Sequence, residues 1–174
     1  DFDISKISLA GAQFDFEKLK WFNLKHLQKK SGEELLELLA GFRCNTKGLS
    51  KEKSTEVLNI AKERSNTLKD LWEVCRCFYE SPKTYDKKGR KKAVSNNTKA
   101  VLENLLEMLE SLSSEDAKNI KTKLHEFCEQ ASLGEKNIKM SEIMMPLRMA
   151  MVGSLSGLDI SFIISRVGVK ESCK

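Results

Sequence analysis

The sequence predicts an all-α fold. Apolar residues recur at the three- and four-residue spacings that place side chains on one face of a helix, and they do so along nearly the whole chain. Residues that favour helix starts precede several of these segments. No run alternates apolar and polar residues clearly enough to indicate a strand. With 174 residues, the chain can form one large domain or two small helical ones, each with a modest core.

The first part of the chain contains four predicted helices. The first covers residues 15–30, and the second begins after Ser31, with Glu34 three residues later in the spacing of a capping box. Two more cover residues 50–64 and 67–80. The apolar stripe that predicts the second helix consists of Leu35, Leu38, Leu39 and Phe42.

The later part of the chain has the same periodicity. Further helices are predicted at residues 101–112, 114–131, 141–152 and 159–167. In the first of them, Glu103, Glu107 and Glu110 lie outside the apolar stripe, as they would on the solvent face of an amphipathic helix. That stripe consists of Val101, Leu102, Leu105, Leu106, Leu109 and Leu112.

A segment of linker-like composition separates the two parts. The helical period stops at Pro82 and gives way to the sequence KTYDKKGRKKAVSNN. We therefore expect two helical subdomains, at residues 1–79 and 80–174. The basic residues of this segment resemble a nuclear-localisation patch or a phosphate-binding loop, although a solvated surface loop explains them more simply. They are Lys83, Lys87, Lys88, Arg90, Lys91 and Lys92.

Composition restricts the class of protein. The net charge of +5 and the pI near 8.9 favour a polyanionic partner, although a lysine-rich proteome would give the same balance. Five irregularly spaced cysteines do not make a disulfide framework, so we expect a cytoplasmic protein. No apolar stretch approaches the roughly 20 residues that span a bilayer, which excludes a membrane protein. Because the chain opens at Asp1 in mid-pattern, we expect it to be part of a longer protein.

Several apparent chemical motifs lack what a site needs. Cys75 and Cys77 are two apart on a helix and point to different faces, and His125 with Cys128 would need two more zinc ligands. The segment GSLSG has Leu155 where a G-x-S-x-G nucleophile would stand. We therefore expect no catalytic residue, no metal and no cofactor in this chain.

Two distant blocks resemble one family. FDFEKLKWFNLKHLQK, residues 14–29, and MPLRMAMVGSLSG, residues 145–157, resemble segments of bacterial-type glutamyl-tRNA synthetases, which are class I aminoacyl-tRNA synthetases. RSNTLKDL and FYESPKTYD fall between them in the family's order. The sequence departs from the family at Val152, where threonine is common, and at Leu158, where proline is common.

The resemblance implies the anticodon-binding region of such a ligase, two helical subdomains that form an α-helix cage. It implies that the catalytic domain, with its ATP and magnesium, lies upstream in the same polypeptide, and that this chain catalyses nothing alone. The implied partner is the anticodon loop of glutamate tRNA, and the implied state is a monomer. We keep a helical protein-interaction module as the alternative function.

Arg148 is the one charged residue in an apolar run, PLRMAMV, that leads into a glycine- and serine-rich turn. A guanidinium there needs a carboxylate, a phosphate or a base edge. The resemblance implies an anticodon contact, and an ion pair with Asp159 is the alternative. In the turn, Ser156 and Gly157 would let the backbone approach an unpaired base, and Ile160 could pack against it.

Arg64 is the second candidate for base reading. The resemblance implies that an arginine here distinguishes glutamate tRNA from glutamine tRNA, whose third anticodon bases are cytosine and guanine. Arginine only donates hydrogen bonds, and cytosine offers two acceptors on its pairing edge where guanine presents mostly donors. The alternatives are a structural role at the end of a helix, where a cation favours the dipole, and a non-discriminating ligase that also charges glutamine tRNA.

Overall fold

A computed structural model describes residues 14–112, 116–133 and 138–173, and it confirms the all-α fold. Within these ranges the chain forms α-helices and short 3-10 helices, with no strand. The predicted helices are all present, although their bounds shift by a few residues. None of the helices in the described ranges combines the length and apolar character needed to cross a bilayer.

Side-chain caps start the helices of the first group. Ser31 and Glu34 form the predicted capping box, and Asp15, Ser50 and Thr67 each accept a hydrogen bond from a backbone N–H in the first turn. Each of these caps satisfies a backbone N–H that has no partner inside its helix. The elements are α1 (Phe16–Lys29), α2 (Gly32–Gly41), α3 (Lys51–Ala61), η2 (Lys62–Arg64), α4 (Leu68–Cys75) and η3 (Arg76–Phe78).

The second group is built around α8 (Met140–Val152), which packs against three of its neighbours. Its apolar positions Ile143, Leu147 and Met149 are buried. The other elements are α5 (Lys87–Ala93), α6 (Thr98–Glu110), α7 (Ala117–Leu133), α9 (Ile160–Val167) and α10 (Val169–Ser172).

Residues 87–93 of the lysine-rich segment form a helix, so the expected loop is wrong for them, whereas Lys83 lies exposed outside any helix. The carboxylate of Asp86 caps the start of α5 by accepting from the backbone N–H of Gly89. Gly89 and Ala93 are buried, and a Cβ atom at position 89 would lie 3.1 Å from Sδ of Met149. The small residues therefore let α5 pack closely on α8. The expected exposure is confirmed, because all the basic side chains of α5 face solvent.

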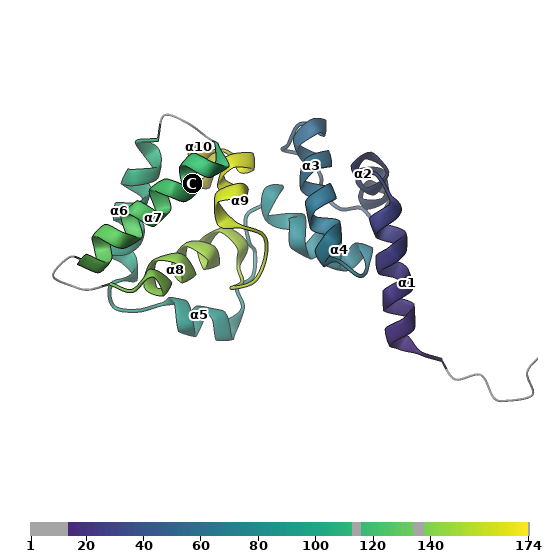
Figure 1. Cartoon of the computed structure of the whole chain (residues 1–174), viewed down its shortest axis with the longest axis horizontal. Coiled ribbons are helices and arrows are strands. Elements are labelled where there is room, and N and C mark those ends of the chain that lie inside the picture. Colours follow the sequence, from purple (N-terminus) through teal and green to yellow (C-terminus); the bar gives the residue numbers. More distant parts are fainter. Residues whose placement is uncertain (1–13, 113–115, 134–137, 174) are drawn as a thin grey trace, which may run out of the picture.

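The two groups of helices occupy opposite ends of the molecule (Figure 1). Helix α3 packs on α2 and α4, α8 packs on α5, α6 and α7, and η3 contacts α9 across the boundary. At that contact the rings of Phe78 and Phe162 meet edge to face at 5.8 Å. The division of the chain into two subdomains at residue 80 stays a prediction.

Helix α1 projects from the first group (Figure 1), and most of its apolar side chains are exposed. Leu27 is its one fully buried side chain, whereas Trp21 is 53% exposed. The helical spacing of Trp21 from Lys18 would suit a core position, but this exposure shows that Trp21 is not a core residue.

Candidate nucleic-acid interface

The turn between α8 and α9 requires glycine at two positions. Gly153 ends α8 in the left-handed conformation with φ of 78°, and a Cβ atom there would lie 2.6 Å from the carbonyl oxygen of Thr84. Gly157 has a φ of 143°, which residues with a side chain rarely adopt. Between them, the Ser154 hydroxyl donates to the carbonyl oxygen of Ser156 over 2.8 Å. These conformations and this hydrogen bond fix the path of the backbone through the turn.

Arg64 reaches this turn from the first group of helices. It is the last residue of η2, which continues directly from α3, and its side chain is exposed. Its Nη1 atom donates to the carbonyl oxygen of Gly157 over 3.0 Å. A guanidinium carries five N–H donors, and among the described residues one of them has this protein acceptor. The remaining donors are available to a ligand.

Arg148 approaches the same turn from α8. It is half-buried, and its Nη1 atom donates to the carbonyl oxygen of Leu158 over 2.8 Å. Burial raises the pKa of the Cys77 thiol to about 11, and the charges of Arg148 and Arg76 oppose part of this rise.

The alternative ion pair between Arg148 and Asp159 is wrong. The carboxylate of Asp159 instead caps α9, accepting from the backbone N–H of Ser161 over 2.9 Å, from the Ser161 hydroxyl and from the N–H of Phe162. These bonds hold the pKa of Asp159 below its ordinary value, although burial alone acts to raise it. Arg148 donates its hydrogen bond to the backbone carbonyl oxygen of Leu158 instead.

Ile160 and Ser156 have different environments. Ile160 is 3% exposed and lies in the core, so its side chain cannot pack against a base in this structure, and that part of the expected site is corrected. It starts α9, whose Ile163 and Ile164 share the same core. Ser156 is exposed and lies beside the half-buried Gly157.

An open pocket of about 560 Å³ joins these elements. Arg64 and Arg76 line it, and so do Gly153, Ser154, Ser156 and Gly157 of the turn. The remaining lining residues are Glu73, Val74, Thr84, Asp86 and Val152. The pocket combines hydrogen-bond donors, exposed backbone and small apolar surfaces, which suits an unpaired base more than a duplex.

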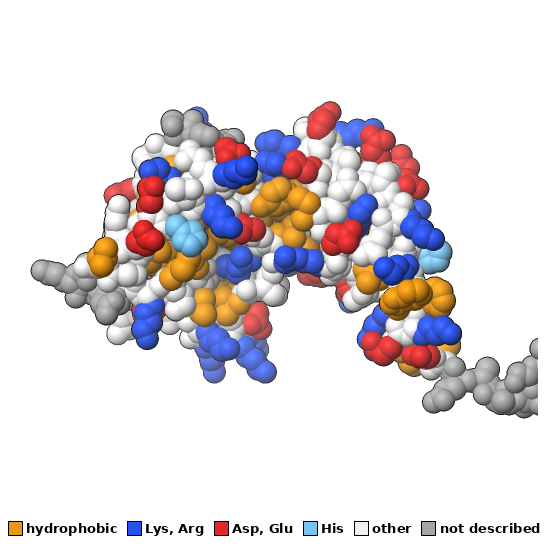
Figure 2. All heavy atoms as spheres, in the orientation of Figure 1, with side chains coloured by type: hydrophobic (Ala, Val, Ile, Leu, Met, Phe, Trp, Pro, Cys, Tyr) orange, Lys and Arg blue, Asp and Glu red, His pale blue; other side chains and the backbone are white. Residues whose placement is uncertain are grey.

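A basic surface lies beside this pocket. The backbone N–H of Asp86 donates to the carbonyl oxygen of Gly153 over 2.8 Å, which ties the start of α5 to the turn. Figure 2 shows blue side chains gathered over α5. The five exposed cations of α5, which we call the α5 basic surface, are Lys87, Lys88, Arg90, Lys91 and Lys92.

Sequence reasoning did not predict several polar residues of this region. Arg76, Thr84 and Asp86 line the pocket, but only the fold brings them to the turn. For Asp86 there was a signal, because an aspartate directly before a short lysine-rich segment is typical of a helix start. Arg76 and Thr84 have no such signal.

The model of a known family, described as an anticodon binding domain, matches residues 19–174. The chain belongs to the anticodon-binding domain family. This confirms the resemblance that the two sequence blocks indicated.

Curated relatives of this anticodon-binding domain include two bacterial enzymes. The glutamate–tRNA ligase of Flavobacterium johnsoniae is 31% identical over 173 residues, covering 98% of this chain and 33% of the relative. That of Porphyromonas gingivalis is 35% identical over 172 residues, again covering 98% of this chain and 33% of the relative. The chain therefore spans about a third of the length of the curated relatives it matches.

Solved structures of glutamate–tRNA ligases contain a region with the same fold as this anticodon-binding domain. A crystal structure of a glutamate tRNA ligase from Elizabethkingia meningosepticum in complex with its amino acid superposes with a TM-score of 0.78 at 35% identity, covering 99% of this chain and 34% of that one. Another, of the glutamate-tRNA synthetase from Elizabethkingia anophelis, has a TM-score of 0.72 at 34% identity, covering 99% and 33%.

Proposed function

We propose that this chain reads the anticodon of glutamate tRNA as the C-terminal part of a glutamate–tRNA ligase, which attaches glutamate to its tRNA using ATP. The observation that carries the proposal is Arg64, an exposed guanidinium that meets the glycine turn of the other helical group in an open pocket. Membership in the anticodon-binding domain family and the ligase relatives support the choice of ligand.

We assign base reading to Arg64, Arg148, Ser156 and Gly157. Cytosine offers a ring nitrogen and a carbonyl oxygen as acceptors to the free N–H groups of Arg64. Guanine presents mostly donors, so buried polar groups would remain unpaired, at a cost of about 1–3 kcal/mol. We therefore propose a discriminating ligase that rejects glutamine tRNA.

We assign phosphate binding to the α5 basic surface. Its cations are exposed and adjacent to the pocket, where the backbone of an anticodon loop would pass. Lysine and arginine contacts of this kind add affinity without reading sequence.

The ligation chemistry belongs to the remaining two thirds of such an enzyme, where we place the ATP and magnesium. We propose that the exposed apolar part of α1 packs against that portion of the polypeptide, because Phe16 and Trp21 are 68% and 53% exposed here. We further propose a cytoplasmic monomer, in keeping with five free thiols.

Affinity for two anticodon stem-loops at two salt concentrations tests the function. The glutamate stem-loop should bind about 5- to 150-fold more tightly than the glutamine stem-loop at both salt concentrations, because the ratio reflects base reading. Both affinities should fall as salt rises, since the slope reflects phosphate contacts. Equal affinities would overturn the discriminating specificity, and no binding of either RNA would overturn the function.

A further inference from the structure

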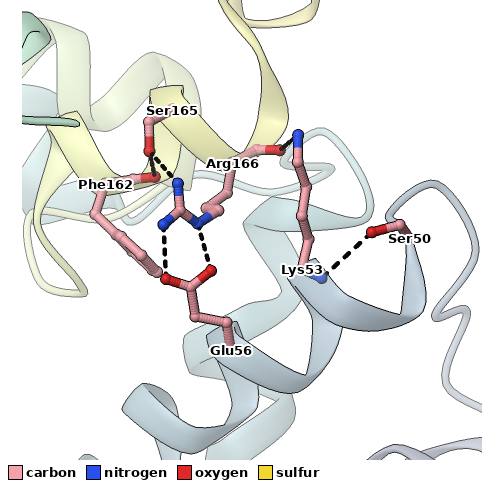
Figure 3. Close-up of polar contacts among 6 residues, drawn as sticks. All are labelled: Ser50, Lys53, Glu56, Phe162, Ser165 and Arg166. Carbon is pink, nitrogen blue, oxygen red and sulfur yellow. Dashed lines mark hydrogen bonds and ion pairs between the residues drawn. The ribbon is translucent and has the colours of Figure 1, made fainter. Parts of the chain in front are cut away.

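An ion pair connects the two groups of helices at a further place, away from the pocket. Glu56 on α3 accepts two hydrogen bonds from Arg166 on α9, from Nε to Oε2 over 2.8 Å and from Nη2 to Oε1 over 2.6 Å (Figure 3). The residues are 110 positions apart in the sequence. Two parallel bonds between planar groups fix an orientation as well as a distance.

Neighbouring contacts hold the Arg166 side chain in place. Its guanidinium lies 5.0 Å from the centre of the Phe162 ring, and its Nη1 atom donates to the hydroxyl of Ser165 over 3.1 Å. Lys53 on α3 also donates to the backbone carbonyl of Arg166 over 3.3 Å. Hydrogen bonding to Glu56 raises the pKa of Arg166, and the charge of Asp116 acts in the same direction. Most exposed ion pairs lack such support.

The ion pair and the Arg64 contact join the same two stretches of chain. Glu56 lies on α3, which leads through η2 to Arg64, while Gly157 precedes α9, which ends near Arg166. The two partners are eight positions apart on the first stretch and nine positions apart on the second. The ring contact of Phe78 with Phe162 also joins the two helical groups. The ion pair adds a contact of fixed orientation, which restricts the angle between the groups.

We propose that Glu56 and Arg166 are positioning residues, which set the angle at which Arg64 meets the turn from Gly153 to Leu158. They touch no base themselves. The purpose of that angle, anticodon reading, rests on the proposed function, whereas the control of the angle is a property of the chain alone. Replacing either residue should therefore loosen the pocket without unfolding either group of helices.

The experiment compares Glu56→Gln and Arg166→Lys with wild type. Glu33→Gln is the matched control, because it removes an exposed ion pair of 3.0 Å with Lys51 that joins α2 to α3 within the first group. Residual dipolar couplings of backbone amides report the relative orientation of α3 and α9 without any RNA. Thermal unfolding and amide chemical shifts within each group report whether the variants stay folded.

One alignment tensor should describe both groups of helices in wild type and in Glu33→Gln. Glu56→Gln should require two tensors, and Arg166→Lys, which keeps the charge but loses the planar fork, should be intermediate. The preference for the glutamate stem-loop over the glutamine stem-loop should fall by up to about fivefold in Glu56→Gln, because one exposed ion pair stabilises an orientation by no more than about this factor. The preference should stay unchanged in the control.

Unchanged orientation in Glu56→Gln would overturn the proposal, and so would altered orientation with an unchanged RNA preference. If wild type itself prefers neither stem-loop, the proposed function fails. The dipolar couplings would then still decide whether the pair sets the angle.

Discussion

The guanidinium of Arg64 donates a hydrogen bond of 3.0 Å to the carbonyl oxygen of Gly157, 93 positions further along the chain. Arg64 belongs to the first group of helices and Gly157 to the turn of the second. The pocket between them therefore depends on both groups. Changes in the turn, in its flanking caps or in the neighbouring charges should have distinct and measurable effects.

Gly153→Ala should lower the free energy of unfolding by about 1–3 kcal/mol, because position 153 has a φ that alanine rarely adopts. The new Cβ atom would also lie 2.6 Å from the carbonyl oxygen of Thr84. Gly41→Ala is the control, since nothing lies within 4 Å of a Cβ atom at that helical position. It should stabilise the protein by about 0.5–1 kcal/mol. Denaturant unfolding measures the change in the free energy of unfolding for both variants. Equal changes would contradict the left-handed conformation of Gly153.

Asp159→Ala should lower the free energy of unfolding by about 1 kcal/mol at pH 7, because it removes the cap of α9. The folded pKa of Asp159 is below its ordinary value of 3.8. The contribution of the charged carboxylate is therefore complete above pH 3.8 and is lost as the pH falls through the lower, folded pKa. Unfolding at pH 7 and pH 3 measures the difference between wild type and variant.

The difference in the free energy of unfolding between wild type and Asp159→Ala should be smaller at pH 3 than at pH 7. Glu129→Ala, which removes an exposed carboxylate from α7, should change stability little at either pH. A destabilisation by Asp159→Ala that grows toward low pH would contradict the assigned role of the cap.

Lys88→Gln combined with Lys91→Gln should weaken binding of both anticodon stem-loops and leave their ratio unchanged. The plot of log affinity against log salt should become shallower by about 0.7 for each lysine that contacts a phosphate. Titrations at several salt concentrations measure this slope. Lys47→Gln combined with Lys118→Gln removes the same charge from other exposed positions. An equal loss of slope in that control would mean that the α5 basic surface has no special role.

Leu27→Ala should lower the free energy of unfolding by about 2–5 kcal/mol, since Leu27 is 7% exposed and belongs to the core. Trp21→Ala, on the same helix, should change it by no more than about 0.5 kcal/mol, because Trp21 is 53% exposed. Thermal or denaturant unfolding measures the stability of the two variants. If Trp21→Ala destabilises the protein as much as Leu27→Ala does, Trp21 is a core residue after all.

Local sequence signals predicted most of the fold. The pair Ser31 and Glu34 forms the expected capping box, and the apolar stripes mark the core faces of the main helices. Helix α5 was missed because its apolar face consists only of small residues, Gly89 and Ala93, whose burial depends on α8. A periodicity of large apolar residues cannot reveal such a helix.

The site was less predictable, because it depends on contacts between distant segments. The position of Asp159 before an apolar run indicates a helix start, but its charge suits an ion pair with Arg148 equally well. Its hydrogen bonds with Ser161 and Phe162 satisfy that carboxylate and leave Arg148 to the carbonyl oxygen of Leu158. Neither this outcome nor the contact of Arg64 with Gly157 follows from spacing along the chain.

The ratio of the affinities of the Arg64→Gln variant for the two anticodon stem-loops tests the central claim most directly. In wild type, the glutamate stem-loop should bind about 5- to 150-fold more tightly than the glutamine stem-loop, and this ratio should approach one in Arg64→Gln. Circular dichroism should show unchanged helicity, and Arg43→Gln, which replaces an exposed arginine outside the pocket, should keep the wild-type ratio. A wild-type preference that survives in Arg64→Gln would contradict the account.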